Sequence, residues 1–358
     1  MNRHQCLAVC APGVEDLCLA ELQGLGVRVR RGFRGGVEFS ATDRQLYAAN
    51  LWSRTANRIV VRVARFTASH FSDLEAAARD VDWSTWVPDG TTPTMRVTST
   101  SSRLSHTGAV AERLSAVAGR GPGEGPLLVV RLIHDRVTMS IDSSGDPLYQ
   151  RGWRHDAAKA PLRETLAAAL LLVSGWDRTS PLIDPMCGSG TIAIEAALLA
   201  AGIAPGAGRR FAFQDWPSFA PGTWASVAAV PGAGPIPEIV ASDRDQGAVG
   251  AARANAERAG VSASIDIRHA PMSALVPPEG GPGWLVCNPP YGHRVAGGGD
   301  LRDLYAAFGS VVRERLPGWR GTLLVADSRL ARHSGLDLDE RLRTTNGGIP
   351  VHAFSFTN

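Results

Sequence analysis

Two short segments of the sequence carry residues whose types and spacing could do chemistry. The first runs from Asp184 to Thr191, where a hydrophobic stretch breaks into a glycine-rich turn that opens a helix. Glycines let the backbone approach a ligand closely, and free N–H groups at a helix start favour an anion. No Gly-Lys-Ser/Thr follows, and Ile194 stands near the place of a dinucleotide fingerprint's third glycine. The turn therefore indicates a ligand smaller than a dinucleotide, although a glycine turn can also be purely structural.

The second segment is Asn288 to Gly292, which reads Asn-Pro-Pro-Tyr-Gly. Its prolines remove backbone donors, so the carbonyls of Asn288 and Pro289 can face a bound group. An exocyclic nucleobase amine is a poor nucleophile because its lone pair is conjugated with the ring. Two acceptors that hold its hydrogens direct that lone pair at an electrophile, and Tyr291 can stack on the ring. A structural Pro-Pro turn beside an incidental Asn is the alternative, which the position after a strand disfavours.

A nucleoside ligand also needs an acidic residue at the end of the next strand, about 20 residues after the glycines. Asp243 stands 55 residues after Gly188, and removing residues 202–237 as a 36-residue insertion leaves 19. We therefore expect Asp243 to accept from the ribose hydroxyls, whereas Asp245 caps the following helix. The alternative is that both are ordinary helix-start aspartates.

These segments need a sheet to position them, and the second half of the chain predicts one. Hydrophobic strands alternate with Ala-rich helices, which is typical of a parallel sheet covered on both faces. Strands are expected at 181–186, 236–242, 264–268, 283–287 and 321–326, and helices at 161–174, 191–201, 246–259, 301–316 and 329–333. An antiparallel hairpin over 341–345 and 350–356 follows, because Asn346-Gly347 supplies the positive φ angles of a tight turn.

The first half predicts a small α+β region. Strands are expected at 6–9, 27–30, 36–39, 58–64, 94–98, 127–134 and 136–142, helices at 13–22, 43–51, 73–79 and 107–118, and a loop at 120–126. The polar segment 143–159 looks like a hinge. We place the domain boundary near residue 155, which gives domains 1–155 and 156–358.

Composition narrows the class of protein. The 358 residues are 44% hydrophobic with a net charge of +3. No long apolar run or signal-peptide core occurs, so we expect a cytoplasmic protein with no membrane span. The cysteines form no C-x-x-C pair, which indicates buried thiols rather than disulfides or a metal site. Residues 1–160 hold 20 basic and 16 acidic side chains. Nearly all cations are arginines, which suits phosphate but is also typical of codon bias.

The motifs Asp184–Thr191 and Asn288–Arg294 resemble those of class I S-adenosylmethionine-dependent methyltransferases, specifically the THUMP-containing RNA guanine-N2 methyltransferases. Residues 50–58, 141–154 and 160–168 look like the linker and THUMP segments of the bacterial 23S rRNA enzymes, at the first of their methyltransferase modules. The resemblance covers nearly the whole chain. It implies a ferredoxin-like and THUMP RNA-binding region, with THUMP at roughly 44–154, followed by a Rossmann-like methyltransferase sheet that ends in an antiparallel hairpin.

The resemblance also implies the cofactor, the partner and the site. S-adenosylmethionine is the expected cofactor, and RNA is the expected partner, with 23S rRNA ahead of tRNA and with no metal. The guanine would be held by Asn288, Pro289, Pro290 and Tyr291. The cofactor would be held by Asp184, Pro185, Cys187, Gly188, Ser189, Gly190, Thr191, Asp243 and Asn288. RNA binding would come from the densest basic cluster, which comprises Arg28, Arg30, Arg31 and Arg34. Arg28 and Arg30 would share one face of a strand. A solvated edge strand is equally compatible with that pattern.

The sequence departs from the family at three places. The family's acidic residue after the third strand, which accepts from the adenine amine, is missing, because Arg268 to Met272 reads Arg-His-Ala-Pro-Met. The usual Gly-Glu-Arg after the tetrapeptide is Gly292-His293-Arg294, so a role of that glutamate is unsupported. His293 could accept a proton but is more typical of a hydrogen-bonding neighbour. The chain stops at Asn358, so we expect only the first activity of the two-module enzymes.

Three other functions fit parts of the pattern. A tRNA guanine-N2 methyltransferase would share the architecture, and a DNA adenine-N6 methyltransferase would share the Asn-Pro-Pro-Tyr segment, although not the amino-terminal half. An RNA-binding ribosome assembly factor without catalysis is the third, and the missing acid near His269 favours it.

Overall fold

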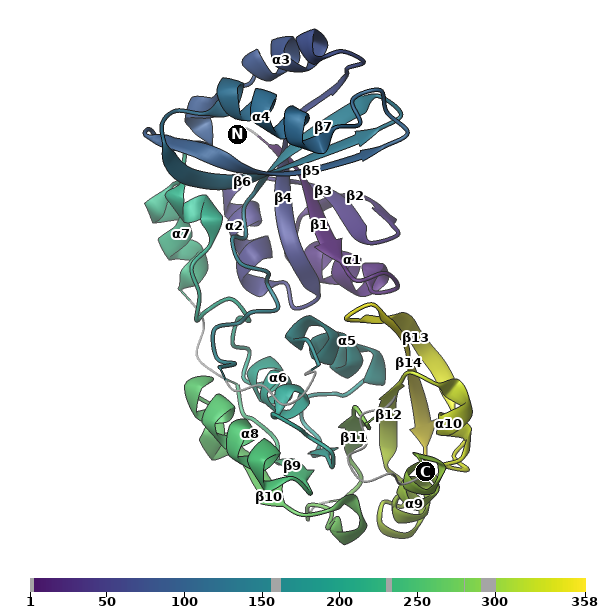
Figure 1. Cartoon of the computed structure of the whole chain (residues 1–358). Helices are drawn as coiled ribbons and strands as arrows, with labels where there is room; N and C mark the ends of the chain where they lie inside the picture. Colours follow the sequence, from purple (N-terminus) through teal and green to yellow (C-terminus); the bar gives the residue numbers. More distant parts are fainter. Residues whose placement is uncertain (1–2, 156–161, 230–233, 280, 291–300) are drawn as a thin grey trace. The chain divides into compact units, whose positions relative to one another are not determined.

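A computed structural model describes residues 3–155, 162–229, 234–279, 281–290 and 301–358 (Figure 1). The chain forms two compact units. Unit 1 comprises Met1–Cys10, Cys18–Leu148 and Arg209–Ala229, and unit 2 comprises Ala11–Leu17, Tyr149–Gly208 and Val230–Asn358. Each unit is built on one seven-stranded sheet, and the α/β fold class expected from the sequence is confirmed.

Unit 1 contains the expected alternation of short strands and helices. Its elements are β1 (His4–Cys10), α1 (Glu15–Gly24), β2 (Arg28–Phe33), β3 (Gly36–Ala41), α2 (Asp43–Trp52), β4 (Ala56–Thr67), α3 (Phe71–Arg79), β5 (Thr91–Thr100), α4 (Thr107–Ala118), β6 (Gly123–Ile133) and β7 (Arg136–Asp142). The sheet order is β2-β3-β1-β4-β7-β6-β5. The β1-α1-β2-β3-α2-β4 part is ferredoxin-like, and β4 joins it to the remaining strands.

Two details of unit 1 differ from the sequence-based expectations. The predicted loop 120–126 is wrong at its end, because β6 begins at Gly123 and pairs in parallel with Thr91 of β5. A register irregularity between Val29 and Arg31 interrupts β2 where it pairs with β3. The simple alternation that would place Arg28 and Arg30 on one face is therefore broken by a bulge.

Unit 2 is a sheet with helices on both faces, and its order is β10-β9-β8-β11-β12-β14-β13. Its strands are β8 (Leu182–Asp184), β9 (Ile239–Asp243), β10 (Ile265–His269), β11 (Trp284–Cys287), β12 (Arg320–Val325), β13 (Asp339–Asn346) and β14 (Ile349–Thr357). The first five are parallel, whereas β14 runs antiparallel to both β12 and β13. This is the Rossmann-like methyltransferase sheet with a terminal hairpin that the sequence predicts.

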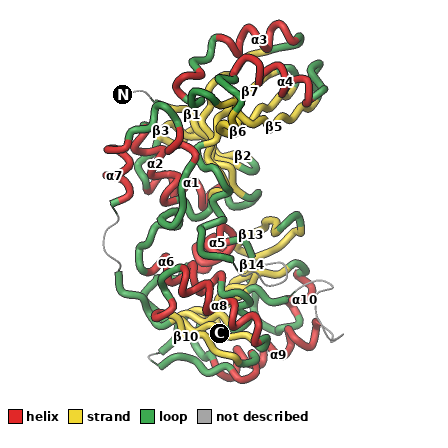
Figure 2. The backbone as a smooth tube through the Cα atoms, turned by 60° about the vertical axis from the view of Figure 1, so that its left-hand side comes forward, coloured by secondary structure: helices red, strands yellow, loops and turns green. Residues whose placement is uncertain are grey.

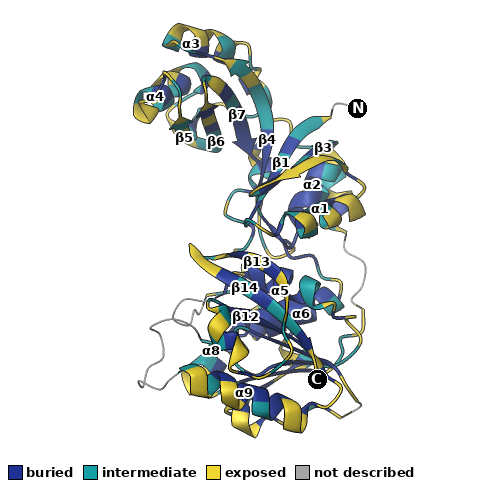
Figure 3. Ribbon diagram, turned by 90° about the vertical axis from the view of Figure 1, so that its right-hand side faces the viewer, coloured by how far each residue is buried: buried dark blue, intermediate teal, exposed yellow. Residues whose placement is uncertain are grey.

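The alternation of side chains along these strands explains the two layers of helices. Leu182, Val286 and Leu324 face one core with helices α5 (Glu164–Ser174), α6 (Thr191–Ala200) and α8 (Gln246–Arg258). Their neighbours Ile183, Leu285 and Leu323 face a second core with α9 (Leu301–Arg315) and α10 (Ser328–Arg332). Figure 2 shows the strands between α8 and α9, and Figure 3 shows the exposed outer residues of α9. The central strands β8 and β11 are buried on both faces, which accounts for their hydrophobic sequences.

The segment treated as an insertion in the sequence is not a loop of unit 2. Residues Arg209–Ala229 belong to unit 1, where helix α7 (Pro221–Ala228) packs on α2. The Tyr47 hydroxyl accepts a hydrogen bond from the Ala220 amide at 3.1 Å, and its ring stacks on Phe213 at 4.3 Å between centroids. The units also change at Leu148/Tyr149 rather than near residue 155, so a single boundary between two contiguous domains does not describe the chain.

Candidate active site

The glycine-rich turn lies where the sequence places it, between β8 and α6. Gly188 and Gly190 have φ angles of +53° and +82°, in the region that favours glycine. A Cβ at Gly188 would meet no atom within 4 Å, whereas a Cβ at Gly190 would lie 3.0 Å from the Cβ of Ala252. The two glycines therefore do different things: Gly188 leaves space open beside the turn, and Gly190 allows α8 to pack against it.

Asp243 at the end of β9 holds this turn through its carboxylate. Its Oδ2 accepts from the Gly188 amide at 2.9 Å, and its Oδ1 accepts from the Asp245 amide at 2.9 Å. Asp245 caps α8, as expected, because its Oδ1 accepts from the amides of Gly247 and Ala248. The half-buried Asp243 carboxylate retains further lone pairs for a ligand hydroxyl, since a carboxylate has about four acceptor sites.

The Asp184 carboxyl and the Cys187 thiol are buried beneath the turn rather than exposed on its surface. Asp184 is 1% exposed, and its Oδ1 has no hydrogen-bond partner among the described residues. Burial, followed by the nearby Asp243 charge, raises the pKa of the Asp184 carboxyl well above its ordinary value. Burial likewise raises the pKa of the Cys187 thiol. All five cysteines are buried and free, as expected, so Cys187 is a packed neutral thiol.

The second segment follows β11, which is the neighbour of β8 in the sheet. Leu285 pairs with Ile183 in parallel, so both strands end at the same edge and bring Asn288 and the glycine turn to one side of the sheet. Asn288 Oδ1 is buried without a partner among the described residues. Pro289 is buried and Pro290 half-buried. Tyr291, with His293, lies outside the described residues.

Side chains that sequence reasoning missed brace the glycine turn from outside. Asn255 on α8 donates to the Ser189 carbonyl at 3.1 Å, and Arg154 donates to the Thr191 hydroxyl at 2.9 Å. Arg154 also lies 3.1 Å from the Glu164 carboxylate, and burial raises the pKa of Glu164 to about 7 despite that guanidinium. The sequence carried one signal, because Asn255 is a polar residue in register with the apolar face formed by Val249 and Ala252.

The region where the family's adenine-binding acid is missing contains main-chain contacts instead. His269 Nε2 lies 3.0 Å from the Arg244 carbonyl, and the Ala270 amide donates to the Asp243 carbonyl at 3.0 Å. The ends of β9 and β10 are thereby joined beside the Asp243 carboxylate.

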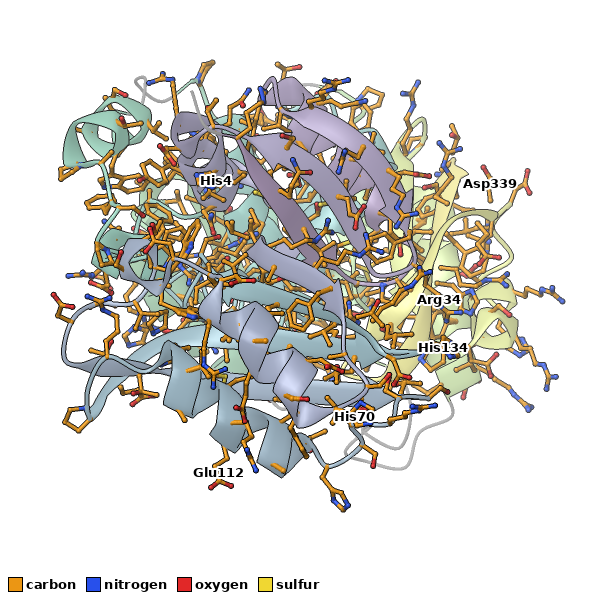
Figure 4. All side chains as sticks on the ribbon, turned by 90° about the horizontal axis from the view of Figure 1, so that it is seen from above. His4, Arg34, His70, Glu112, His134 and Asp339 are labelled. Atoms are coloured by element: carbon orange, nitrogen blue, oxygen red, sulfur yellow. The ribbon has the colours of Figure 1, made fainter. Side chains whose placement is uncertain are left out.

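The arginines expected to contact RNA lie on the exposed edge strand β2 and the turn after it. Arg30 donates to Gln5 at 2.8 Å, and Arg31 pairs with Glu38 at 3.2 Å. Arg28 and Arg34 are exposed, and Arg34 is labelled in Figure 4. Partners within unit 1 thus engage two of the four guanidiniums.

Two other kinds of feature are absent from the described residues, a metal cluster and a membrane-spanning helix. In the described ranges, no group of three or more His, Cys, Asp or Glu side chains is placed to hold a metal ion. No helix of that same part of the chain is long and apolar enough to span a bilayer.

Comparisons with known proteins agree with this architecture. Residues 151–353 match the family described as RMKL-like methyltransferase domain, and residues 5–60 match the RlmL ferredoxin-like domain. The chain is 35% identical over 376 residues to the ribosomal RNA large subunit methyltransferase K/L of Vibrio cholerae, covering 99% of this chain and 53% of that protein. It therefore spans about half the length of this curated relative. It is 33% identical to the Synechocystis protein slr0064, named as a candidate RNA methyltransferase, covering 96% of this chain and 94% of that one.

Solved structures of other proteins also match nearly the whole chain. SMU.472, named as a candidate methyltransferase and solved with S-adenosylhomocysteine, superposes with a TM-score of 0.87 at 27% identity, covering 99% of this chain and 98% of that one. A Listeria monocytogenes protein described as a predicted N6-adenine-specific DNA methylase superposes with a TM-score of 0.88 at 29% identity, covering 99% and 96% of the two chains.

Proposed function

Because the chain belongs to the RMKL-like methyltransferase family, we propose that it is an S-adenosylmethionine-dependent RNA methyltransferase that modifies the exocyclic N2 of a guanosine in 23S rRNA. Two neighbouring features carry this proposal: the open glycine turn after β8, and the Asn288 oxygen after the adjacent strand β11, which has no hydrogen-bond partner among the described residues.

The residues around the turn fit S-adenosylmethionine. The open space beside Gly188 can admit a ligand against the backbone, and the start of α6 offers amides to a carboxylate. Asp243, at the end of β9, would accept from the ribose hydroxyls. Asp184, Pro185, Cys187, Ser189, Gly190 and Thr191 shape the turn itself rather than its outer surface, since all six are buried.

The proposed reaction needs positioning more than acid–base strength. S-adenosylmethionine, when bound, supplies a methyl carbon made electrophilic by its sulfonium. Asn288 Oδ1 and the neighbouring main-chain carbonyls would accept the hydrogens of the guanine N2 and aim its lone pair. Pro289 and Pro290 carry no N–H that could compete for these acceptors. Holding the two reactants in line supplies most of the acceleration, and the amine loses its proton after transfer. Tyr291 would stack on the base.

RNA recognition is assigned to unit 1, which contains most of the region expected at 1–155 together with Arg209–Ala229, with THUMP at roughly 44–154, and catalysis is assigned to unit 2. The target base must be unpaired or flipped to enter the site. Of the arginine cluster, we expect Arg28 and Arg34 to contribute more to phosphate binding than Arg30 and Arg31, whose guanidiniums already have partners.

The large-subunit relative favours 23S rRNA over tRNA. Adenine-N6 methylation is the second candidate, because the Listeria structure is described as a DNA methylase of that type and a planar amine of either base suits Asn288. We place it second because this chain contains the ferredoxin-like region matched at residues 5–60, for which an RNA substrate is the better fit.

Nucleoside mass spectrometry of a deletion strain tests the substrate. Loss of N2-methylguanosine confined to the large-subunit rRNA is expected, whereas loss confined to tRNA, or loss of N6-methyladenine from DNA, would overturn the assignment. Calorimetric titration with S-adenosylmethionine tests catalysis against an assembly role. An absence of binding at millimolar cofactor would support the non-catalytic assembly factor instead.

A further inference from the structure

The glycine turn between β8 and α6 is held by a relay of two side chains on α8. We propose that Asn255 and Arg258 are positioning residues for the cofactor: together they lock the Ser189–Gly190 peptide of the turn before the ligand arrives. This inference rests on the proposed function, since it assumes that S-adenosylmethionine binds beside this turn.

Helix α8 packs closely against the glycine turn. The residues of α8 that face inward are Val249, Ala252, Asn255 and Ala256. Ala252 lies so close to Gly190 that a Cβ there would stand 3.0 Å away. Asn255 is fully buried on the same face, and a buried amide must find partners inside the protein. It therefore stands next to the turn with its hydrogen-bonding groups committed.

Hydrogen bonds fix both ends of one peptide unit in this turn. The Gly190 amide donates to the Cys187 carbonyl at 2.8 Å. The carbonyl of the same peptide, on Ser189, accepts from Asn255 Nδ2 at 3.1 Å. Because glycine has a wide conformational range and Gly188 and Gly190 lie on either side of Ser189, these two hydrogen bonds restrict rotation of that peptide. Locking it also fixes the direction of the amides that follow at the start of α6.

Arg258 sets the orientation of the Asn255 side-chain amide. Arg258 Nη2 donates to Asn255 Oδ1 at 2.6 Å, and a guanidinium can only donate. The amide oxygen must therefore face Arg258, which leaves the NH₂ group facing the Ser189 carbonyl. Arg258 Nε in turn donates to the Trp153 carbonyl at 2.9 Å. Every contact in the relay thus has one possible polarity.

The expected consequence concerns cofactor affinity rather than the chemical step. A preorganised site avoids the entropic cost of ordering the turn when the ligand binds. Loss of one such hydrogen bond should weaken binding by about 5- to 10-fold, and kcat at saturating cofactor should change little.

The test compares two arginines of the same helix. Arg258→Ala removes the relay, whereas Arg253→Ala is the matched control, because Arg253 Nη2 donates to the Ile267 carbonyl of β10 at 2.7 Å and not toward the turn. The Kd for S-adenosylhomocysteine is measured by calorimetry, with the KM for S-adenosylmethionine and kcat alongside. We expect a roughly 5- to 10-fold rise in Kd and KM for Arg258→Ala alone.

A second variant tests the direction of the hydrogen bond from Asn255 to the Ser189 carbonyl. Asn255→Asp keeps the shape and still accepts from Arg258, but it cannot donate to the Ser189 carbonyl, so its Kd should rise at least as much. If Arg258→Ala binds like the wild type, or if Arg253→Ala weakens binding equally, the relay is refuted while the proposed function stands. If the wild type itself fails to bind S-adenosylhomocysteine, the proposed function falls and the inference falls with it.

Discussion

The turns that follow β8 and β11 lie at the same edge of one sheet, yet they treat their polar groups in opposite ways. In the turn after β8, backbone groups of Gly188, Ser189 and Gly190 are paired with Asp243, Asn255 and Cys187. In the turn after β11, Asn288 Oδ1 is buried with no partner in the described ranges, and two prolines follow. A buried acceptor without a partner costs stability, and under the proposed function the substrate amine supplies the missing donor.

The proposed function assigns cofactor binding to the first turn and methyl acceptance to the second, so substitutions should separate the two. The largest effect is expected for Asn288→Ala, which removes the acceptor of the second turn. We expect kcat to fall at least about 100-fold because the amine is no longer aimed, with the Kd for S-adenosylhomocysteine changed less than about twofold. Single-turnover kinetics and calorimetry measure both, and a collapse of cofactor affinity would contradict the division.

A methyl group at Gly188 probes the first turn. Gly188→Ala should raise the Kd for S-adenosylhomocysteine about 10-fold or more, because the new Cβ would point into the space left for the ligand. Gly175→Ala is the matched control, since Gly175 has a φ of +74° and equally open surroundings but ends α5. Equal losses of affinity in both variants would attribute the effect to backbone strain alone.

Asp243→Asn should weaken cofactor binding by about 10-fold. The amide can accept at only one of the two positions that now serve Gly188 and Asp245, and it loses the charge that favours ribose hydroxyls. Asp245→Asn serves for comparison, because asparagine caps a helix about as well as aspartate. An unchanged Kd in Asp243→Asn would remove this residue from the site.

The smallest expected effect is on the pH dependence of folding stability, through Glu164, the ion-pair partner of Arg154. Burial raises the pKa of Glu164 from its ordinary 4.5 to about 7, so the folded state holds this proton more tightly than the unfolded state does. The associated stability is present below about pH 4.5 and is lost as the pH rises through 7. Urea unfolding at pH 5 and pH 8 should show a smaller loss for Glu164→Gln than for the wild type, and identical losses would refute this assignment.

Much of the fold follows from local patterns. Strands buried on both faces, such as β11, read as continuous apolar runs, and the Asn346-Gly347 turn joins β13 and β14. The two site turns follow from glycine and proline, whose backbone preferences are local. The side-chain contacts that support the glycine turn do not follow from local patterns, because Asn255 and Arg154 bond to residues far away in the sequence. The return of Arg209–Ala229 to unit 1 likewise depends on aromatic packing against Tyr47, which no local pattern reports.

The exchange of segments between the units bears on the order in which a growing chain can fold. Unit 1 acquires its last residues only when Ala229 has been synthesised. Unit 2 takes up Ala11–Leu17, and Val14 shares a core with Leu342 and Val351 near the opposite end of the chain. Such distant pairs slow folding, since a long loop must close before the contact forms. During translation, the packing around Val14 can therefore be completed only after Leu342 and Val351 have left the ribosome.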